Sequence, residues 1–408
     1  MIIEQRIKNF ERLGMGVFVH FGAYSVIGRG EWSKLSCQIP WEEYMKAVKS
    51  FNPDPCWAKE LAATAKKAGA RYITLTTRHH DGFSLYDTKG LNDYDAPHVC
   101  GRDLVAEFVK ACRAEGIIPF FYHTLLDWHE EHYDSDFPTY LQYLRKSVEL
   151  LCTNYGEIGG IWFDGKWNKP NEDWEEDALY SMIRSHQPEA MIINNTGMLD
   201  RGALGHIELD SVTFERGRPQ PLNMTDSPKY IASEMCQVFG DHWGYAEMDL
   251  NFKSTAEIIR DLITCRRFGS NFLINVGPMG NGLLRPIEKA SLEVLGQWVD
   301  VNGAILPAMP ASIATNSEGS FILQNGDTYY LVCDHLSMAG DINVALAGGA
   351  TDNTIHFCPG KKIAAMTWLD DNTAVDFQQD EDNTVTLTPK PFGYGRNLVV
   401  RVAKFTLA

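Results

Sequence analysis

Two carboxylates in this chain stand where strand-like apolar segments end. Asp164 closes GGIWFDG (159–165), and Glu215 follows the apolar part of DSVTFERG (210–217). Desolvating a carboxylate costs free energy unless something compensates for it. One acid that stays ionised and a second whose pKa is raised can act as nucleophile and proton donor. Asp164 and Glu215 are therefore the candidates for these two roles.

Polar residues also follow the other apolar segments of the first 300 residues. A polar residue after one strand is common, but the same pattern after seven segments indicates a shared pocket. The residues that end the segments, in chain order, are His20; His79, His80 and Asp81; Tyr122 and His123; Asp164; Asn194 and Asn195; Glu215; and Asn275.

Aromatic residues flank the same positions, which favours a carbohydrate ligand. The C–H faces of a sugar stack on aromatic rings, while its hydroxyls need histidine, asparagine and carboxylate partners. In glycoside hydrolysis one carboxylate attacks the anomeric carbon and the other protonates the leaving oxygen. Carboxyl groups about 5–5.5 Å apart would indicate retention of configuration, and about 6.5 Å or more would indicate inversion. The flanking aromatic residues are Trp32, Tyr122, Trp128, Trp162, Trp167 and Trp243.

The elements that must position these residues alternate between strand and helix. Near-continuous apolar strands separated by helices are typical of a parallel sheet buried on both faces. Seven strands in about 300 residues favour a TIM-like (β/α) barrel, whose active site lies at the carboxyl ends of the strands. The predicted strands are 16–22, 71–82, 117–124, 159–165, 191–197, 210–217 and 270–282, and the predicted helices are 55–69, 102–116, 138–155, 173–186, 255–269 and 285–302.

The last hundred residues have a different pattern. From about residue 305 short alternating runs are divided by turn signals such as Asn-Gly and Gly-Gly. These features predict a small antiparallel β-sandwich. We therefore expect a catalytic barrel over 1–305 and a β-sandwich domain over 306–408.

Composition restricts the partners of the chain. Its 408 residues are 44% hydrophobic and carry a formal charge of −16. That charge disfavours nucleic acid, and a neutral substrate fits better. No apolar run has the length of a membrane span, and we expect a soluble, cytoplasmic protein whose nine cysteines are mostly reduced core residues. The sequence does not specify an oligomeric state.

Six motifs together resemble the α-L-fucosidases of glycoside hydrolase family 29. They occur in the family's order and extend over about residues 20–280. TTRHHDGF followed by WFDG is specific to that family's pattern. The motifs are VHFGAYSV (19–26), GEW (30–32), TTRHHDGFSLYD (76–87), WFDG (162–165), HWGY (242–245) and NFLINVGPMGNG (271–282).

The resemblance implies roles for particular residues. Asp164 would be the nucleophile and Glu215 the acid/base of a retaining double displacement on a small fucosylated glycan. It implies neither a metal nor an organic cofactor. The residues expected to line the fucose pocket are His20, Glu31, Trp32, His79, His80, Tyr122 and Trp162.

The chain departs from the family pattern at two places. Many members carry a sugar-binding arginine after the asparagine pair, where this chain has Thr196; the candidate substitutes are Arg201, Arg216 and Arg218. The acid/base position also varies within the family. Glu234, in SEMCQVFGDHWGY, is therefore the alternative to Glu215.

Two other classes of function are compatible with parts of the sequence. His79, His80 and Asp81 could be ligands in a metal-dependent barrel hydrolase, although adjacent strand residues point to opposite faces and make poor paired ligands. A barrel that binds sugar without catalysis is the second alternative. The two carboxylates at strand ends argue against that alternative.

Overall fold

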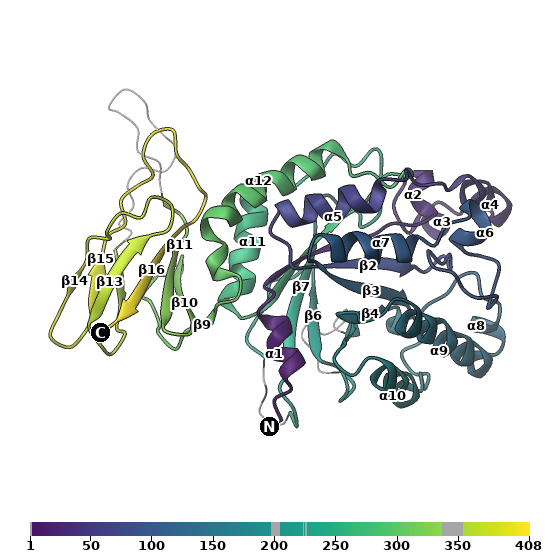
Figure 1. The fold of residues 1–408 in the computed structure, drawn as a ribbon, viewed down its shortest axis with the longest axis horizontal. Coiled ribbons are helices and arrows are strands. Elements are labelled where there is room, and N and C mark those ends of the chain that lie inside the picture. Colours follow the sequence, from purple (N-terminus) through teal and green to yellow (C-terminus); the bar gives the residue numbers. More distant parts are fainter. Residues whose placement is uncertain (1, 197–204, 223, 225–226, 318, 337–353) are drawn as a thin grey trace.

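The fold is that of a computed structural model, which describes residues 2–196, 205–222, 224, 227–317, 319–336 and 354–408. Eight parallel strands form a closed barrel in sequence order, and β8 pairs with β1 to close it. The predicted TIM-like (β/α) barrel is thereby confirmed (Figure 1). The strands are β1 (Met15–Val19), β2 (Tyr72–Arg78), β3 (Ile118–Thr124), β4 (Gly160–Asp164), β5 (Met191–Asn194), β6 (Ser211–Glu215), β7 (Ala232–Val238) and β8 (Asn271–Val276).

The expectation of seven strands was one too few, because β7 does not look like an apolar strand. Its polar residues Ser233, Glu234 and Gln237 interrupt the apolar pattern, yet all three are buried. Ser233 shares a hydrogen bond with Ser270, the residue just before β8. Glu234 accepts hydrogen bonds from Tyr72 and Trp162 inside the barrel. Hydrogen-bond partners elsewhere in the fold thus allow a polar segment to occupy a central strand.

Six predicted helices are present and surround the barrel. Several begin with a side-chain cap: Asp103 accepts a hydrogen bond from the backbone of Ala106, and Ser254 forms a capping box with Glu257. The six helices are α5 (Trp57–Lys67), α7 (Leu104–Ala114), α9 (Phe137–Asn154), α10 (Glu176–His186), α11 (Thr255–Arg267) and α12 (Pro286–Asn302).

Further helices lie before the barrel and in its loops. Most have four or five residues, too short for the sequence periodicity to reveal them. They are α1 (Gln5–Glu11), α2 (Tyr24–Ile27), α3 (Ser33–Ser36), α4 (Trp41–Ser50), α6 (Ala96–Cys100) and α8 (His132–Ser135). Among the described residues, none of the helices combines the length and apolar character required to cross a lipid bilayer.

Large rings fill the barrel interior below the strand ends. Phe18, Tyr72, Tyr122 and Trp162 belong to one buried cluster inside the strands. Gly16 faces this cluster on β1, where an added Cβ would lie 2.5 Å from Cζ of Tyr72. A larger residue at that position would therefore displace the Tyr72 ring from the interior.

The C-terminal part consists of antiparallel sheets next to α11 and α12, as Figure 1 shows. The ring of Trp298 on α12 donates to the backbone oxygen of Val400 at 3.2 Å, and Arg260 on α11 pairs with Asp334 at 3.1 Å. One sheet contains β13 (Ile363–Trp368), β16 (Arg401–Leu407), β11 (Thr328–Cys333), β10 (Ser320–Asn325) and β9 (Met309–Pro310), and the other contains β12 (Ile355–Phe357), β15 (Val385–Leu387) and β14 (Gln378–Gln379).

Candidate active site

A pocket opens at the carboxyl ends of the barrel strands. This is the end at which barrel enzymes assemble their active sites. Segments far apart in the sequence contribute to it because each strand ends at the same rim. Its lining residues are Phe18, His20, Trp32, His79, His80, Tyr122, Trp162, Asp164, Trp167, Asn195, Glu215, Cys236 and Trp243.

The structure brings together all the predicted site residues except Glu31. That residue is buried, and its Oε2 accepts a hydrogen bond from the backbone N–H of Gly244 at 2.7 Å. Glu31 thereby ties the GEW motif to the HWGY motif, while the next residue, Trp32, lines the pocket. Glu31 is thus not among the lining residues, although its charge acts on Glu215, and its contact with the sugar stays a prediction.

Asp164 is surrounded by hydrogen-bond donors. The Tyr122 hydroxyl donates to Oδ2 at 3.1 Å, and the ring N–H of Trp167 donates to Oδ1 at 3.3 Å. Nε2 of His80 lies 3.5 Å from Oδ2. Burial alone would raise the pKa of Asp164, but His80, Trp167 and the backbone of Gly165 outweigh burial and hold that pKa below its usual value. Asp164 is therefore the acid that stays ionised.

Glu215 has the opposite environment. Nδ2 of Asn195 donates a hydrogen bond to its Oε2 at 2.7 Å. Burial, followed by the negative charge of Asp164, raises the pKa of Glu215, and Asn195 and Arg216 oppose that rise only in part. Glu215 is thus the acid that holds its proton to higher pH.

Asn195 links the two carboxyl groups. The Thr213 hydroxyl donates to Oδ1 of Asn195 at 2.8 Å, which turns the amide nitrogen toward the acids. That nitrogen lies 3.3 Å from Oδ1 of Asp164 and 2.7 Å from Oε2 of Glu215. These two oxygens are consequently no farther apart than the sum of those distances. The sequence identified Asn195 as a polar strand end but not as this link.

The histidines at the pocket are held in defined states. Burial lowers the pKa of His20 to about 3 and that of His79 well below its usual value, so both are neutral at physiological pH. Oγ1 of Thr124 donates to the backbone oxygen of Leu126 at 2.5 Å and lies 2.7 Å from Nδ1 of His80. The remaining ring nitrogen of His80 faces Asp164.

Indole rings form one wall of the pocket. The ring of Trp32 lies edge-on to Trp128, at 5.0 Å between centroids, and stacks on Trp167 at 5.9 Å. On the opposite side Tyr122 stacks on Trp162 at 5.7 Å. Phe18 also lines the pocket; strand alternation places it on the same face as His20, a signal the sequence analysis did not use.

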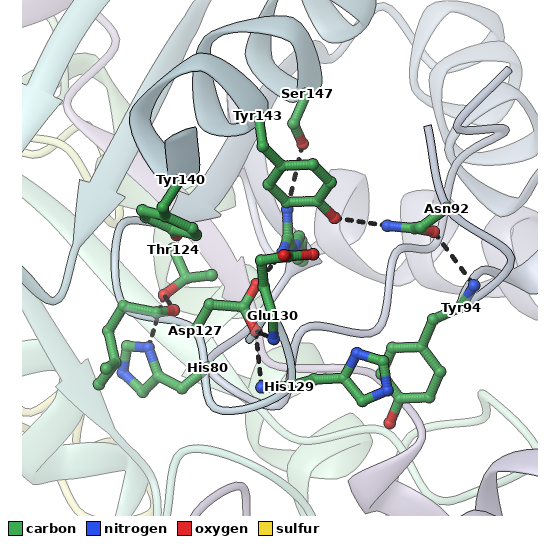
Figure 2. A network of polar contacts seen from close by, with 12 residues as sticks. His80, Asn92, Tyr94, Thr124, Asp127, His129, Glu130, Tyr140, Tyr143 and Ser147 are labelled. Carbon is green, nitrogen blue, oxygen red and sulfur yellow. Dashed lines mark hydrogen bonds and ion pairs between the residues drawn. The ribbon is translucent and has the colours of Figure 1, made fainter. Parts of the chain in front are cut away.

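A buried ion pair supports the wall from behind. Arg78, at the end of β2, pairs with Asp127, which follows β3, and both are fully buried. Oδ1 of Asp127 accepts from the backbone N–H groups of His129 and Glu130 at 2.8 and 2.9 Å. Figure 2 shows this network between the helix α9 and the loop that carries Asp127. The pair thereby fixes the segment that contains Trp128.

The backbone of the same segment is bound to the pocket itself. The N–H of Trp128 donates to the backbone oxygen of His80 at 2.8 Å. Arg78 and His80 are two residues apart at the end of β2, so one strand end carries both the ion pair and a pocket histidine. The aromatic wall and the neighbouring histidine are therefore positioned together.

The three arginines considered as substitutes at the sugar site differ in position. The guanidinium of Arg216 lies over the ring of Trp243, 5.2 Å from its centroid, and donates to the backbone oxygen of Asp241 at 2.5 Å. Arg218 is exposed, and no contact places it at the pocket. Arg201 lies outside the described residues. Arg216 is thus the arginine next to a pocket ring.

Glu234, the alternative acid/base, lies below the pocket. It is 1% exposed and is not a lining residue. The ring N–H of Trp162 donates to its Oε1 at 3.1 Å, and the Tyr72 hydroxyl donates to its Oε2. With both oxygens bound inside the barrel, Glu234 is not placed to protonate a leaving group in the pocket.

The metal-binding alternative has little support in this geometry. Asp81, which follows the two histidines, accepts a hydrogen bond from the Tyr44 hydroxyl at 2.6 Å. Within the ranges that the structure describes, no three His, Cys, Asp or Glu side chains are grouped so as to hold a metal ion.

The sequence of this chain is similar to characterised fucosidases over most of its length. The family model described as Alpha-L-fucosidase matches residues 4–304. The tissue alpha-L-fucosidase of Bos taurus is 28% identical over 363 residues, which cover 80% of this chain and 74% of that protein. The human tissue alpha-L-fucosidase is also 28% identical, over 378 residues, 82% of this chain and 77% of that protein.

Solved structures show the same architecture. Alpha-L-fucosidase isoenzyme 1 from Paenibacillus thiaminolyticus superposes with a TM-score of 0.83 at 28% identity and covers 99% of both chains. A covalent intermediate of a Bacteroides thetaiotaomicron alpha-L-fucosidase, trapped with 2-fluoro-fucosyl fluoride, has a TM-score of 0.81 at 22% identity and covers 99% of this chain and 96% of that chain. Since the family model extends over the whole barrel, this chain belongs to the alpha-L-fucosidase family.

Proposed function

We propose that this chain hydrolyses terminal α-L-fucosyl linkages of small glycans with retention of configuration. In this reaction Asp164 is the nucleophile and Glu215 the acid/base. The observation that carries the proposal is the arrangement around Asn195, whose amide nitrogen lies within 3.3 Å of both carboxyl groups. Their pKa values are shifted in opposite directions, as the two roles require.

The reaction consists of two displacements. In the first, Glu215 gives its proton to the glycosidic oxygen while Asp164 attacks the anomeric carbon, and the bond from that carbon to the leaving oxygen breaks. In the second, Glu215 takes a proton from water, the water oxygen attacks the same carbon, and the ester to Asp164 breaks. Fucose leaves and both carboxyl groups return to their starting states.

The spacing of the acids favours retention over inversion. The sum of the two distances to the Asn195 nitrogen sets an upper limit on the separation of Oδ1 of Asp164 and Oε2 of Glu215. That limit is below the gap of about 6.5 Å or more that an inverting enzyme needs to admit a water molecule. Direct attack by Asp164 requires no such gap.

The rest of the lining suits a neutral deoxysugar. Neutral His20 and His79 can exchange hydrogen bonds with hydroxyl groups without adding charge. Phe18 and Trp243 give the pocket an apolar part that could face the methyl group of fucose.

Proton NMR of a fresh digest tests the proposal. The enzyme is mixed with an aryl α-L-fucoside, and the anomeric signals are followed before mutarotation. We expect α-L-fucose to appear first and activity to survive EDTA. Initial release of the β anomer would overturn the double displacement, and failure to cleave any α-L-fucoside would overturn the activity.

A further inference from the structure

A buried carboxyl group lies directly beneath the pocket and takes no part in the two displacements. Glu234 sits on β7 two residues before Cys236, which lines the pocket. Residues two apart on a strand share a face. Glu234 therefore points into the barrel one level deeper than the pocket floor, where it is 1% exposed.

Each oxygen of this carboxyl group has its own donor. Oε1 accepts from the ring N–H of Trp162 at 3.1 Å, and Oε2 accepts from the hydroxyl of Tyr72. No ion pair with Glu234 occurs among the described residues. Burial raises its pKa to about 7, and the hydrogen bonds from Tyr72 and Trp162 offset that rise in part.

Trp162 connects this group to the nucleophile. It lies two residues before Asp164 on β4 and lines the pocket on the same face. Its indole stacks on Tyr122 with an interplanar angle of 19°, and the Tyr122 hydroxyl donates to Oδ2 of Asp164 at 3.1 Å. A shift of the indole would thus move both the sugar-facing ring and a donor to Asp164.

We propose that Glu234 is a positioning residue, which fixes the indole of Trp162 beneath the bound sugar and, through the Trp162–Tyr122 stack, the hydrogen bond to the nucleophile. The side chain is buried in every direction and reaches no substrate atom, so its action is indirect. The inference relies on the proposed function for the role of Asp164.

Glu234→Met is the principal test. The thioether is similar in length and removes both carboxyl oxygens, so the indole N–H of Trp162 and the hydroxyl of Tyr72 both lose their acceptor. We expect kcat/KM to fall at least tenfold, because misplacement by about 1 Å can cost on the order of 10²-fold. The factor should be the same for an activated aryl fucoside and a fucosyl disaccharide, and added azide should not restore turnover.

Tyr72→Phe is the matched control, because it removes the other donor and leaves the bond to Trp162 in place. We expect its kcat/KM to change less than threefold. In a Trp162→Phe background, Glu234→Met should add little further loss, since the hydrogen bond to the indole is already absent. A full, additive loss in that background would overturn the proposal.

Other outcomes are equally decisive. A loss confined to substrates with poor leaving groups, with azide rescue, would make Glu234 the acid/base and overturn the positioning role. Unchanged kinetics in Glu234→Met would overturn it too. Should that variant not fold, Trp162→Phe tests the same bond from its other end, and unaltered kcat/KM there would contradict the proposal. Azide rescue of Asp164 variants, by contrast, bears only on the proposed function.

Discussion

The two halves of the barrel mouth hold their acids in different ways. Between β2 and β4 the carboxylate of Asp164 faces a phenol, an indole and a histidine, each within 3.5 Å. On the other side, at the end of β6, Glu215 has the Asn195 amide as its hydrogen-bond donor. Hydrogen-bond donors stabilise the negative charge of Asp164 in the first half. In the second half, burial and the negative charge of Asp164 raise the pKa of Glu215.

The strands that carry the two acids also differ in how regularly they pair with their neighbours. β3 pairs with β4 continuously from Phe120 to Thr124, whereas β5 pairs with β6 through Ile193 and Ser211 alone. At the base of β6, Asp210 adds side-chain contacts to the pairing. Its backbone N–H donates to the backbone oxygen of Ile192 at 2.9 Å, its Oδ2 accepts from the backbone N–H of Ile192 at 2.9 Å, and its carboxylate also binds Arg6 and Lys229. Asp164 thus lies at the end of a regularly paired strand, whereas Glu215 lies at the end of a strand that ion pairs hold at its base.

This difference explains the opposite shifts in pKa. Burial raises the pKa of any carboxyl group, so Asp164 needs several donors to remain ionised. Glu215 needs fewer, because a proton donor must keep its proton at the working pH. The negative charge of Asp164 adds to that effect, which couples the ionisation of the two acids.

The strongest test of the comparison removes the acid of the donor-rich half. Asp164→Gly should lower kcat on an aryl α-L-fucoside on the order of 10³-fold or more, because no other group can form the glycosyl ester. Azide should restore turnover of an activated substrate and give β-fucosyl azide. The product is identified by NMR.

Asp93→Asn is a suitable control for this experiment, because Asp93 is an exposed acid outside the pocket. Its activity should equal that of the unmodified chain. A glycine variant at position 164 that keeps more than a tenth of the original rate would assign the nucleophile elsewhere.

Removal of the acid in the other half should give a smaller loss that depends on the substrate. Glu215→Ala should reduce cleavage of a fucosyl disaccharide by roughly 10²-fold or more, since general acid catalysis contributes typically 10²–10⁴-fold. A substrate with a dinitrophenyl leaving group needs no proton in the first step and should be affected far less. Added azide should here give α-fucosyl azide, formed from the glycosyl-enzyme. Equal losses on both substrates would remove the acid/base role from Glu215.

The sequence predicted the donor-rich half better than the other half. β1 to β4 are apolar until they end abruptly in polar residues, so their ends could be located and His20, His79, His80, Tyr122 and Asp164 identified. Those strands carry their chemistry at their carboxyl ends. The change from apolar to polar residues was therefore sufficient to locate the ends of these strands.

The other half depends on contacts between strands that a sequence does not display. β7 is polar inside the barrel because Tyr72 and Trp162, from other strands, hold Glu234. Asn195 binds both acids only because Thr213 orients its amide. Glu31 binds the backbone of Gly244, a residue more than two hundred positions away, a contact that the sequence does not reveal. Each of these placements follows from tertiary packing.

The smallest expected effect concerns the coupling of the two acids. Asp164→Asn removes the charge that, after burial, raises the pKa of Glu215, so that pKa should fall toward its ordinary value. A fall means that Glu215 loses its proton at lower pH than in the unmodified chain. Carbon-13 NMR titration of enzyme labelled at its glutamate residues measures the pKa of Glu215. The signal of Glu215 is identified by its absence from the spectrum of Glu215→Gln.

Asp81→Asn supplies the comparison for this titration. Asp81 is a buried acid at the same mouth, but its charge is not among the causes of the Glu215 shift. That variant should leave the titration of Glu215 in place. An equal fall of the Glu215 pKa in both variants would mean that looser packing around the pocket, and not the loss of the Asp164 charge, causes the change. No fall in Asp164→Asn would mean that burial alone keeps Glu215 protonated, and the two halves would then act independently.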